Sequence, residues 1–158
     1  MLSLLRIYYE ERRPNTVASE VKLYCKESGD GNGFALPSAD EVLGSRIVVT
    51  TLSMAACLVR LGMHGRFSHI FLDEAGQALE CEAIIPLSLA VGSTCVVLSG
   101  DHRQMSPTVY SRAARQGKLH LSLLERLFLH YKKFDLLRYN AVMLYHNYRS
   151  FLFSIATI

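Results

Sequence analysis

The stretch "HIFLDEAGQALECEAIIPL", from His69 to Leu87, carries an apolar run directly into the adjacent carboxylates of Asp73 and Glu74. Neighbouring carboxylates repel each other and are costly to remove from water, so a buried strand that ends in them needs a reason. A solvated turn would explain the pair. A divalent cation held between the chain and a phosphate would explain it as well, and both explanations stay open at this point.

Three continuous apolar runs set the fold class. They are "RIVVTTLS" (46–53), "FSHIFLDE" (67–74) and "STCVVLSGDH" (93–102). Runs of this kind predict strands of a parallel sheet covered on both faces. The segment 75–92 between the last two predicts a crossover helix, with Pro86 in the first turn of a second short helix. The sequence therefore predicts an α/β fold that contains a right-handed βαβ unit.

The flanking sequence predicts four further elements. They are a strand over 4–9, a glycine-rich loop and turn over 29–38, a helix over 123–131 and a last strand over 141–146. The S-x-x-E spacing of Ser122 and Glu125 is typical of a capping box and predicts the start of that helix.

All three central runs end in polar residues: Thr50, Thr51 and Ser53; Asp73 and Glu74; Gly100 and Asp101. Ligands of open α/β sheets bind beyond the carboxyl ends of the strands, so three such endings in neighbouring strands predict one shared site. An Asp-Glu pair there suits phosphate chemistry, because one carboxylate can hold Mg²⁺ through its water shell while the other polarises a water molecule. Small residues after the pair permit close backbone approach.

Composition excludes several classes of protein. The chain has 158 residues, half of them hydrophobic, which suffices for an ordinary folded domain. Its net charge of +3 and the basic pair Arg12-Arg13 permit nucleic-acid binding without indicating it. The four cysteines form no C-x-x-C pair and the six histidines show no ligand spacing, so we expect no structural zinc site. Because no apolar run could cross a bilayer, we expect no membrane association. Three of the cysteines have apolar or helical neighbours, which is typical of reduced thiols, so we expect a soluble protein of the cytoplasm, with the nucleus as a second compartment.

Three motifs carry a resemblance to a known family. "DEAGQA" (73–78) resembles motif II of superfamily 1 helicases, "GDHRQMSP" (100–107) resembles motif III, and "NYRS" (147–150) is similar to motif IV. Their order and spacing agree with that superfamily. The wider run over 71–131 resembles its RNA-directed branch, and the likeness fades after Arg149. The resemblance implies a RecA-like P-loop NTPase fold, with a parallel sheet and flanking helices. It further implies that residues 1–139 are the C-terminal part of a first RecA-like domain and residues 140–158 the start of a second.

The resemblance also implies roles for the residues that match its motifs. Asp73 would hold the Mg²⁺ of ATP, Glu74 would be the catalytic base, and Gln77 would bind near the nucleotide. Gln104 would sense the γ-phosphate, and Arg149 would act as an arginine finger supplied within the chain.

Further residues would join the nucleotide to the nucleic acid. Gly100 and Asp101 would act with Gln104 to link the nucleotide to the nucleic-acid groove. Tyr148 would stack near the adenine of the nucleotide. Thr50 and Thr51 would touch the nucleic-acid backbone, a contact that positions a strand without reading its sequence. Threonine is also common in strands for packing reasons alone, so a purely structural role for this pair stays open.

One motif of the family is missing from the sequence. Nothing matches G-x-x-x-x-G-K-[ST], and "GDGNGF" (29–34) is followed by no lysine or hydroxyl that could grip a phosphate. In addition, Phe151 stands where the family usually has histidine. We therefore expect an internal part of a helicase in which the P-loop half is missing. Residues 1–158 alone should hydrolyse no more ATP than a Glu74→Gln control.

The sequence leaves two principal hypotheses of function. The first is a fragment of an ATP-dependent helicase that uses ATP and Mg²⁺ on single-stranded RNA, with DNA as the alternative substrate and mRNA-regulatory protein complexes as partners. The second is a non-catalytic nucleic-acid-binding or scaffold fragment. A GTPase is disfavoured because no guanine-binding N-K-x-D motif is present.

Overall fold

The computed structural model describes residues 3–144, and the chain divides into two compact units, 1–125 and 126–158. The first unit contains β1 (Leu4–Arg6), η1 (Pro14–Thr16), α1 (Ser19–Lys22), α2 (Ala39–Leu43), β2 (Ile47–Val49), η2 (Ser53–Ala55), α3 (Ala56–Arg60), β3 (His69–Leu72), α4 (Glu80–Leu87), β4 (Cys95–Leu98) and α5 (Arg112–Gln116). Helix α6 (Leu123–Lys133) spans the boundary, and α7 (Leu137–Asn140) lies in the second unit. None of the helices in the described range is long and apolar enough to cross a membrane.

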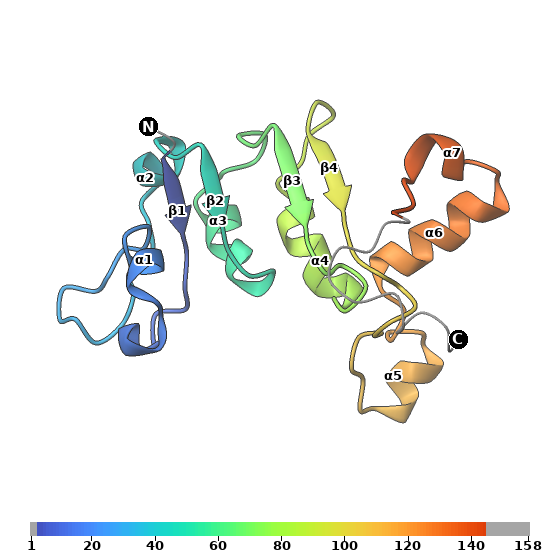
Figure 1. Ribbon diagram of the computed structural model, residues 1–158, viewed down its shortest axis with the longest axis horizontal. Helices are drawn as coiled ribbons and strands as arrows, with labels where there is room; N and C mark the ends of the chain where they lie inside the picture. Colours follow the sequence, from blue (N-terminus) through green and yellow to red (C-terminus); the bar gives the residue numbers. More distant parts are fainter. Residues whose placement is uncertain (1–2, 145–158) are drawn as a thin grey trace, which may run out of the picture. The chain divides into compact units, whose positions relative to one another are not determined.

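The four strands pair in parallel, as the apolar runs predict. β1 pairs with β2, with Arg6 opposite Val49, and β3 pairs with β4, with Leu72 opposite Leu98. All four arrows point the same way (Figure 1). The β3–α4–β4 segment is therefore the predicted βαβ unit. Each central strand is shorter than its predicted run and stops where the polar residues begin.

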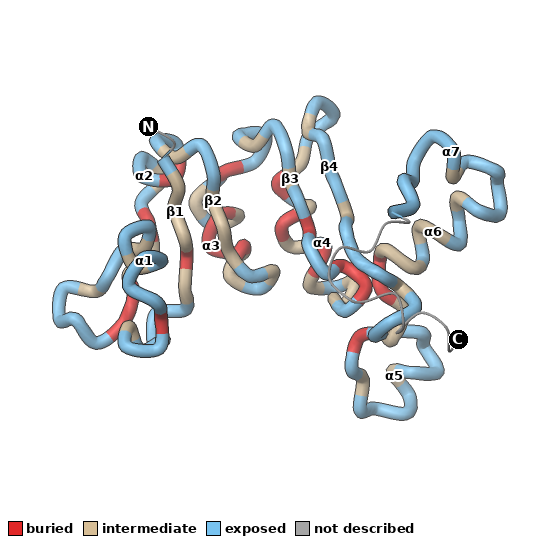
Figure 2. Tube along the Cα trace, in the orientation of Figure 1, coloured by how far each residue is buried: buried red, intermediate tan, exposed pale blue. Residues whose placement is uncertain are grey.

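The single sheet expected from the sequence is not what the described residues form. They form two two-stranded sheets, β1–β2 and β3–β4, and β2 does not pair with β3. Coverage of both faces was also a wrong expectation, because Phe71 is 71% exposed and β4 is exposed along most of its length (Figure 2). An apolar run predicts a strand, but it does not identify the strand's neighbour or the element that covers each face.

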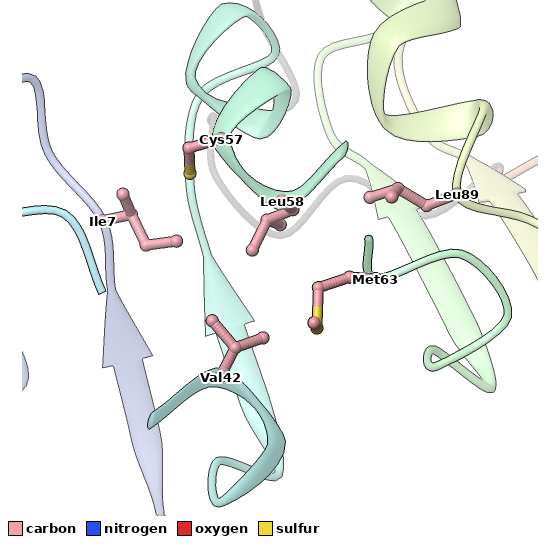
Figure 3. Close-up of a cluster of buried hydrophobic side chains, with 6 residues drawn as sticks. All are labelled: Ile7, Val42, Cys57, Leu58, Met63 and Leu89. Atoms are coloured by element: carbon pink, nitrogen blue, oxygen red, sulfur yellow. The ribbon is translucent and has the colours of Figure 1, made fainter. Parts of the chain in front are cut away.

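A hydrophobic cluster connects the two sheets in place of hydrogen bonds. Its buried members are Ile7, Val42, Cys57, Leu58, Met63 and Leu89, and Figure 3 shows these side chains pointing toward one another. Val48 of β2 and Ile70 of β3 both pack against this cluster. Burial of this apolar surface therefore stabilises the arrangement of both strand pairs within the first unit.

Two predicted elements differ from the structure and one agrees. The crossover is a single helix, α4, with Pro86 in its last turn rather than two helices separated near that residue. Proline near a helix end removes only one backbone hydrogen bond, so the helix continues through it. The strand predicted over 141–146 is wrong for 141–144, which have no strand partner, while 145–146 lie outside the described residues. Helix α6 begins as predicted, with the Ser122 hydroxyl accepting from the Glu125 backbone N–H at 3.1 Å.

Helix α2 begins with a capping box that the sequence analysis missed. The Ser38 hydroxyl accepts from the Glu41 N–H at 3.3 Å, and the Glu41 carboxylate accepts from the Ser38 N–H at 2.6 Å. The spacing S-x-x-E over residues 38–41 is the signal that could have found it. Lys26 adds a salt bridge to the same carboxylate at 2.8 Å.

The Lys26–Glu41 pair makes stability depend on pH. The hydrogen bond from Lys26, followed by that from the Ser38 backbone, lowers the pKa of Glu41 from 4.5 to about 2. A carboxyl group with a depressed folded pKa stabilises the protein above its unfolded pKa, and this contribution is lost as the pH falls from about 4.5 to about 2. We expect the melting temperature of the Glu41→Gln variant to change less with pH in that window than that of the unmodified protein. Glu20→Gln is the control, and equal pH profiles for all three proteins would contradict the assignment.

Candidate functional site

The loops after β3 and β4 are held together by a continuation of strand pairing. The Ser99 backbone N–H donates to the Leu72 carbonyl at 2.9 Å, and the Ala75 N–H donates to the Ser99 carbonyl at 2.8 Å. These bonds lie on either side of Asp73 and Glu74, so the carboxylate pair leaves the sheet beside the turn that follows β4. Two of the three strand ends that the sequence predicts to lie together are therefore adjacent in the structure.

Two glycines let the loops approach within van der Waals contact. A Cβ on Gly76 would lie 2.8 Å from the Asp101 carbonyl oxygen, and a Cβ on Gly100 would lie 3.0 Å from the backbone nitrogens of Ala75 and Gly76. Gly100 also has a φ of 149°, which L side chains rarely adopt. Glycine is thus required at both positions to bring the loops together.

Glu74 stands in a strained backbone conformation at the centre of the site. Its φ is 52°, in the left-handed region that costs a non-glycine residue about 1–3 kcal/mol. The Gln77 backbone N–H donates to the Glu74 carbonyl at 3.0 Å, and the Gln77 side-chain amide donates to the Glu74 carboxylate at 3.4 Å. The tight turn therefore aims an exposed carboxylate outward and supports it with a neutral amide.

Asp73 is oriented by a neighbour on β4. Its Oδ1 accepts from the Ser99 hydroxyl at 2.8 Å, while its Oδ2 has no protein donor among residues 3–144. Ser99 is not among the site residues expected from the sequence, although a hydroxyl at the end of an apolar run and next to a glycine is a signal that could have indicated it.

The turn after β4 fixes a second carboxylate and an amide. Asp101 accepts from the Arg103 backbone N–H at 2.8 Å through Oδ1 and from the Gln104 side-chain amide at 3.0 Å through Oδ2. Gln104 is thereby tethered to the loop that contacts Gly76. Because Asp73, Glu74 and Asp101 are all solvent-exposed, their negative charge is available to a cation.

The donor set at this edge fits one magnesium ion bound mainly through water. No cluster of three or more His, Cys, Asp or Glu side chains that could enclose a metal occurs in the described range. Mg²⁺ commonly needs only one or two carboxylates together with phosphate oxygens and water, and it prefers hard oxygen ligands. The unengaged Oδ2 of Asp73, with Ser99 fixing the other oxygen, meets that requirement.

The structure brings six of the predicted site residues together: Asp73, Glu74, Gln77, Gly100, Asp101 and Gln104. Thr50 and Thr51 instead follow β2, in the other two-stranded sheet, so the expectation of one site across three neighbouring strands is wrong for this pair. Thr51 caps the turn into η2 by accepting from the Met54 N–H at 3.3 Å. Tyr148 and Arg149 lie outside the described residues.

Comparison with known proteins gives a family match over most of this unit. Residues 3–112 match the family model described as an AAA domain. The chain is 49% identical over 147 residues to a Danio rerio protein named "Probable helicase with zinc finger domain". It is 41% identical over 148 residues to the Mus musculus protein "3'-5' exoribonuclease HELZ2" and 37% identical over 127 residues to the Mus musculus protein "RNA helicase Mov10l1". The predicted resemblance to RNA-directed helicases is confirmed by these relatives.

The aligned segments are small parts of these relatives. The match covers 92% of this chain but 8% of the Danio rerio protein. The corresponding shares are 92% and 5% for HELZ2, and 79% and 10% for Mov10l1. The chain therefore spans at most a tenth of the length of each of these proteins.

Proposed function

Because this chain belongs to the AAA domain family, whose model matches residues 3–112, we propose that it is part of an ATP-dependent helicase that acts on single-stranded RNA. The helicase names of its relatives support this assignment, and DNA is the alternative substrate. The observation that carries the proposal is the backbone contact between the loops after β3 and β4. That contact places a carboxylate pair and a tethered glutamine at one edge of a parallel sheet.

Each loop has a distinct part in the proposed hydrolysis. Asp73, oriented by Ser99, would hold Mg²⁺, which when bound neutralises charge on the phosphates. Glu74 accepts a proton from the attacking water, because its carboxylate is exposed and held outward by the turn. Gln104 senses the γ-phosphate. Its side-chain amide donates to Asp101, whose backbone lies against Gly76, so a movement of Gln104 is transmitted to the loop after β3.

The proposal extends to residues outside the sequence of these two loops. Thr50 and Thr51 bind the nucleic-acid backbone, Tyr148 stacks on adenine, and Arg149 approaches the γ-phosphate. The full fold is RecA-like, with a first domain through residue 139 and a second from residue 140. Cytoplasmic and nuclear mRNA-regulatory complexes are the proposed setting. Hydrolysis also needs a phosphate-binding loop, which the sequence of residues 1–158 does not contain.

A non-catalytic nucleic-acid-binding or scaffold role is the second candidate. Residues 1–158 by themselves contain no G-x-x-x-x-G-K-[ST] motif and are compatible with that role. The two candidates differ in whether ATP is consumed, so a measurement of hydrolysis separates them.

The test is ATP hydrolysis by the complete gene product that carries this sequence. We expect hydrolysis that requires Mg²⁺ and rises on addition of single-stranded RNA, with a smaller rise for DNA of the same sequence. RNA binding without any Mg²⁺-dependent hydrolysis would contradict the helicase candidate and support the scaffold candidate. Absence of both activities would contradict the two candidates together.

A further inference from the structure

Two arginines share one tyrosine ring in the segment that follows β1. The guanidinium carbon of Arg6 lies 4.7 Å from the centroid of the Tyr8 ring, and that of Arg12 lies 4.3 Å from it. Phe34, which is 2% exposed, packs against the same ring with centroids 5.0 Å apart. The buried phenylalanine thus fixes the tyrosine, and the tyrosine positions both cations by cation–π contact.

Within residues 3–144 these two positive charges take part in no ion pair. The neighbouring Glu11 is engaged elsewhere: its charge and its hydrogen bond raise the pKa of the exposed Tyr9 hydroxyl. Like charges held beside one ring repel each other, so an anion bound between or beside them would be favourable.

The edge of the sheet beside this arginine pair also contains unsatisfied polar atoms. Arg6 Nε and Thr50 Oγ1 are buried and have no hydrogen-bond partner in the structure described here. Arg6 is paired with Val49, the residue before Thr50, so both atoms belong to the carboxyl ends of β1 and β2. A buried polar group without a partner costs free energy, so a polar ligand that reached this end of the two strands would be stabilised there.

We propose that Arg12 and Arg6 bind a backbone phosphate of the single-stranded nucleic acid that passes Thr50 and Thr51. The inference rests on the proposed function, because it extends the nucleic-acid path assigned there to this threonine pair. Parallel pairing places the ends of β1 and β2 at the same edge, and Figure 1 shows these two strands side by side. The planar guanidinium fork matches a phosphate, and Tyr8 acts as the positioning residue.

The test is the affinity of the complete gene product for fluorescein-labelled poly(U), measured by fluorescence anisotropy over a series of salt concentrations. Arg12 is exposed, so Arg12→Ala is compatible with folding, which thermal unfolding of each variant checks. We expect Arg12→Ala to weaken binding about fivefold at low salt and to reduce the slope of log K against log salt by about 0.7, the value for one phosphate of a single strand. Arg12→Lys keeps the charge and should retain the slope.

Arg46→Ala is the matched control, because Arg46 is exposed and precedes β2 at the opposite edge of the same sheet. Its affinity and salt slope should equal those of the unmodified protein. A purely structural arginine pair would lower the melting temperature of Arg12→Ala and leave the salt slope unchanged, which would overturn the inference while the proposed function stands. Failure of the unmodified protein to bind poly(U) would overturn both.

Discussion

Replacement of Glu74 by glutamine is expected to reduce RNA-stimulated ATP hydrolysis by the complete gene product at least ~100-fold, the lower range for loss of a general base. Glutamine preserves the size of the side chain and can still accept a hydrogen bond from Gln77, but it cannot take a proton from water. Because Asp73 and its bond from Ser99 are unchanged, binding of the Mg²⁺–nucleotide complex should persist. Steady-state phosphate release, together with fluorescent-nucleotide binding, measures the two effects separately.

Glu82→Gln supplies the control for this experiment. It makes the same chemical change in α4, outside the β3 and β4 loops, and should leave hydrolysis unchanged. If Glu74→Gln hydrolyses ATP at the unmodified rate, the base is a different residue. If nucleotide binding is lost together with hydrolysis, Glu74 contributes to binding rather than to proton transfer.

The βαβ part of the site could be predicted from sequence because its signals are local. The apolar run before Asp73 and the run before Gly100 each fix a strand, and one helix of crossover length between them makes parallel pairing the default. Parallel pairing brings the carboxyl ends of these two strands to the same edge of the sheet, so no further information is needed to predict that they lie together. The motifs "DEAGQA" and "GDHRQMSP" stand on these endings, so the resemblance and the physical argument identify the same residues.

The remaining differences concern contacts that depend on distant partners. Thr50 and Thr51 follow an apolar run like the others, yet β2 pairs with β1 and not with β3. The pattern of β2 alone does not distinguish these neighbours, because an apolar strand is compatible with either. Likewise Ser99 orients Asp73 across the ladder, a contact between residues 26 apart in sequence that no local pattern specifies.

The glycine-rich segment 29–34 makes a close backbone contact that its sequence does not predict. Its sequence does not match that of a phosphate-binding loop, so the glycines indicate only a loop and a turn. The structure gives one of them a packing role: the Phe34 N–H donates to the Glu10 carbonyl at 3.1 Å, and Gly33 lies directly against the same carbonyl group. A close backbone approach of this kind has no signature beyond the glycine itself.

Gly33→Ala is therefore expected to destabilise the protein by about 3 kcal/mol or more, the upper range for single substitutions that force atoms into a packed site. A Cβ on Gly33 would lie 2.1 Å from the Glu10 carbonyl oxygen and 3.3 Å from its carbon. Both are backbone atoms, which cannot rotate away as a side chain would. The loop must instead separate from residues 8–12 and break the Phe34–Glu10 hydrogen bond, which also removes the support of the Tyr8 ring. Chemical denaturation measures the change in the free energy of unfolding.

Gly29→Ala in the same loop distinguishes the contact from a general effect of glycine. A Cβ there would meet no atom within 4 Å, so the variant should be as stable as the unmodified protein, or more stable by less than ~1 kcal/mol through reduced entropy of the unfolded chain. Equal destabilisation by the two substitutions would mean that loop flexibility, rather than the approach to Glu10, is what Gly33 provides. A Gly33→Ala variant that keeps full stability would show that the 29–34 loop does not pack on the segment after β1, and the fixed orientation of Tyr8 would lose its physical basis.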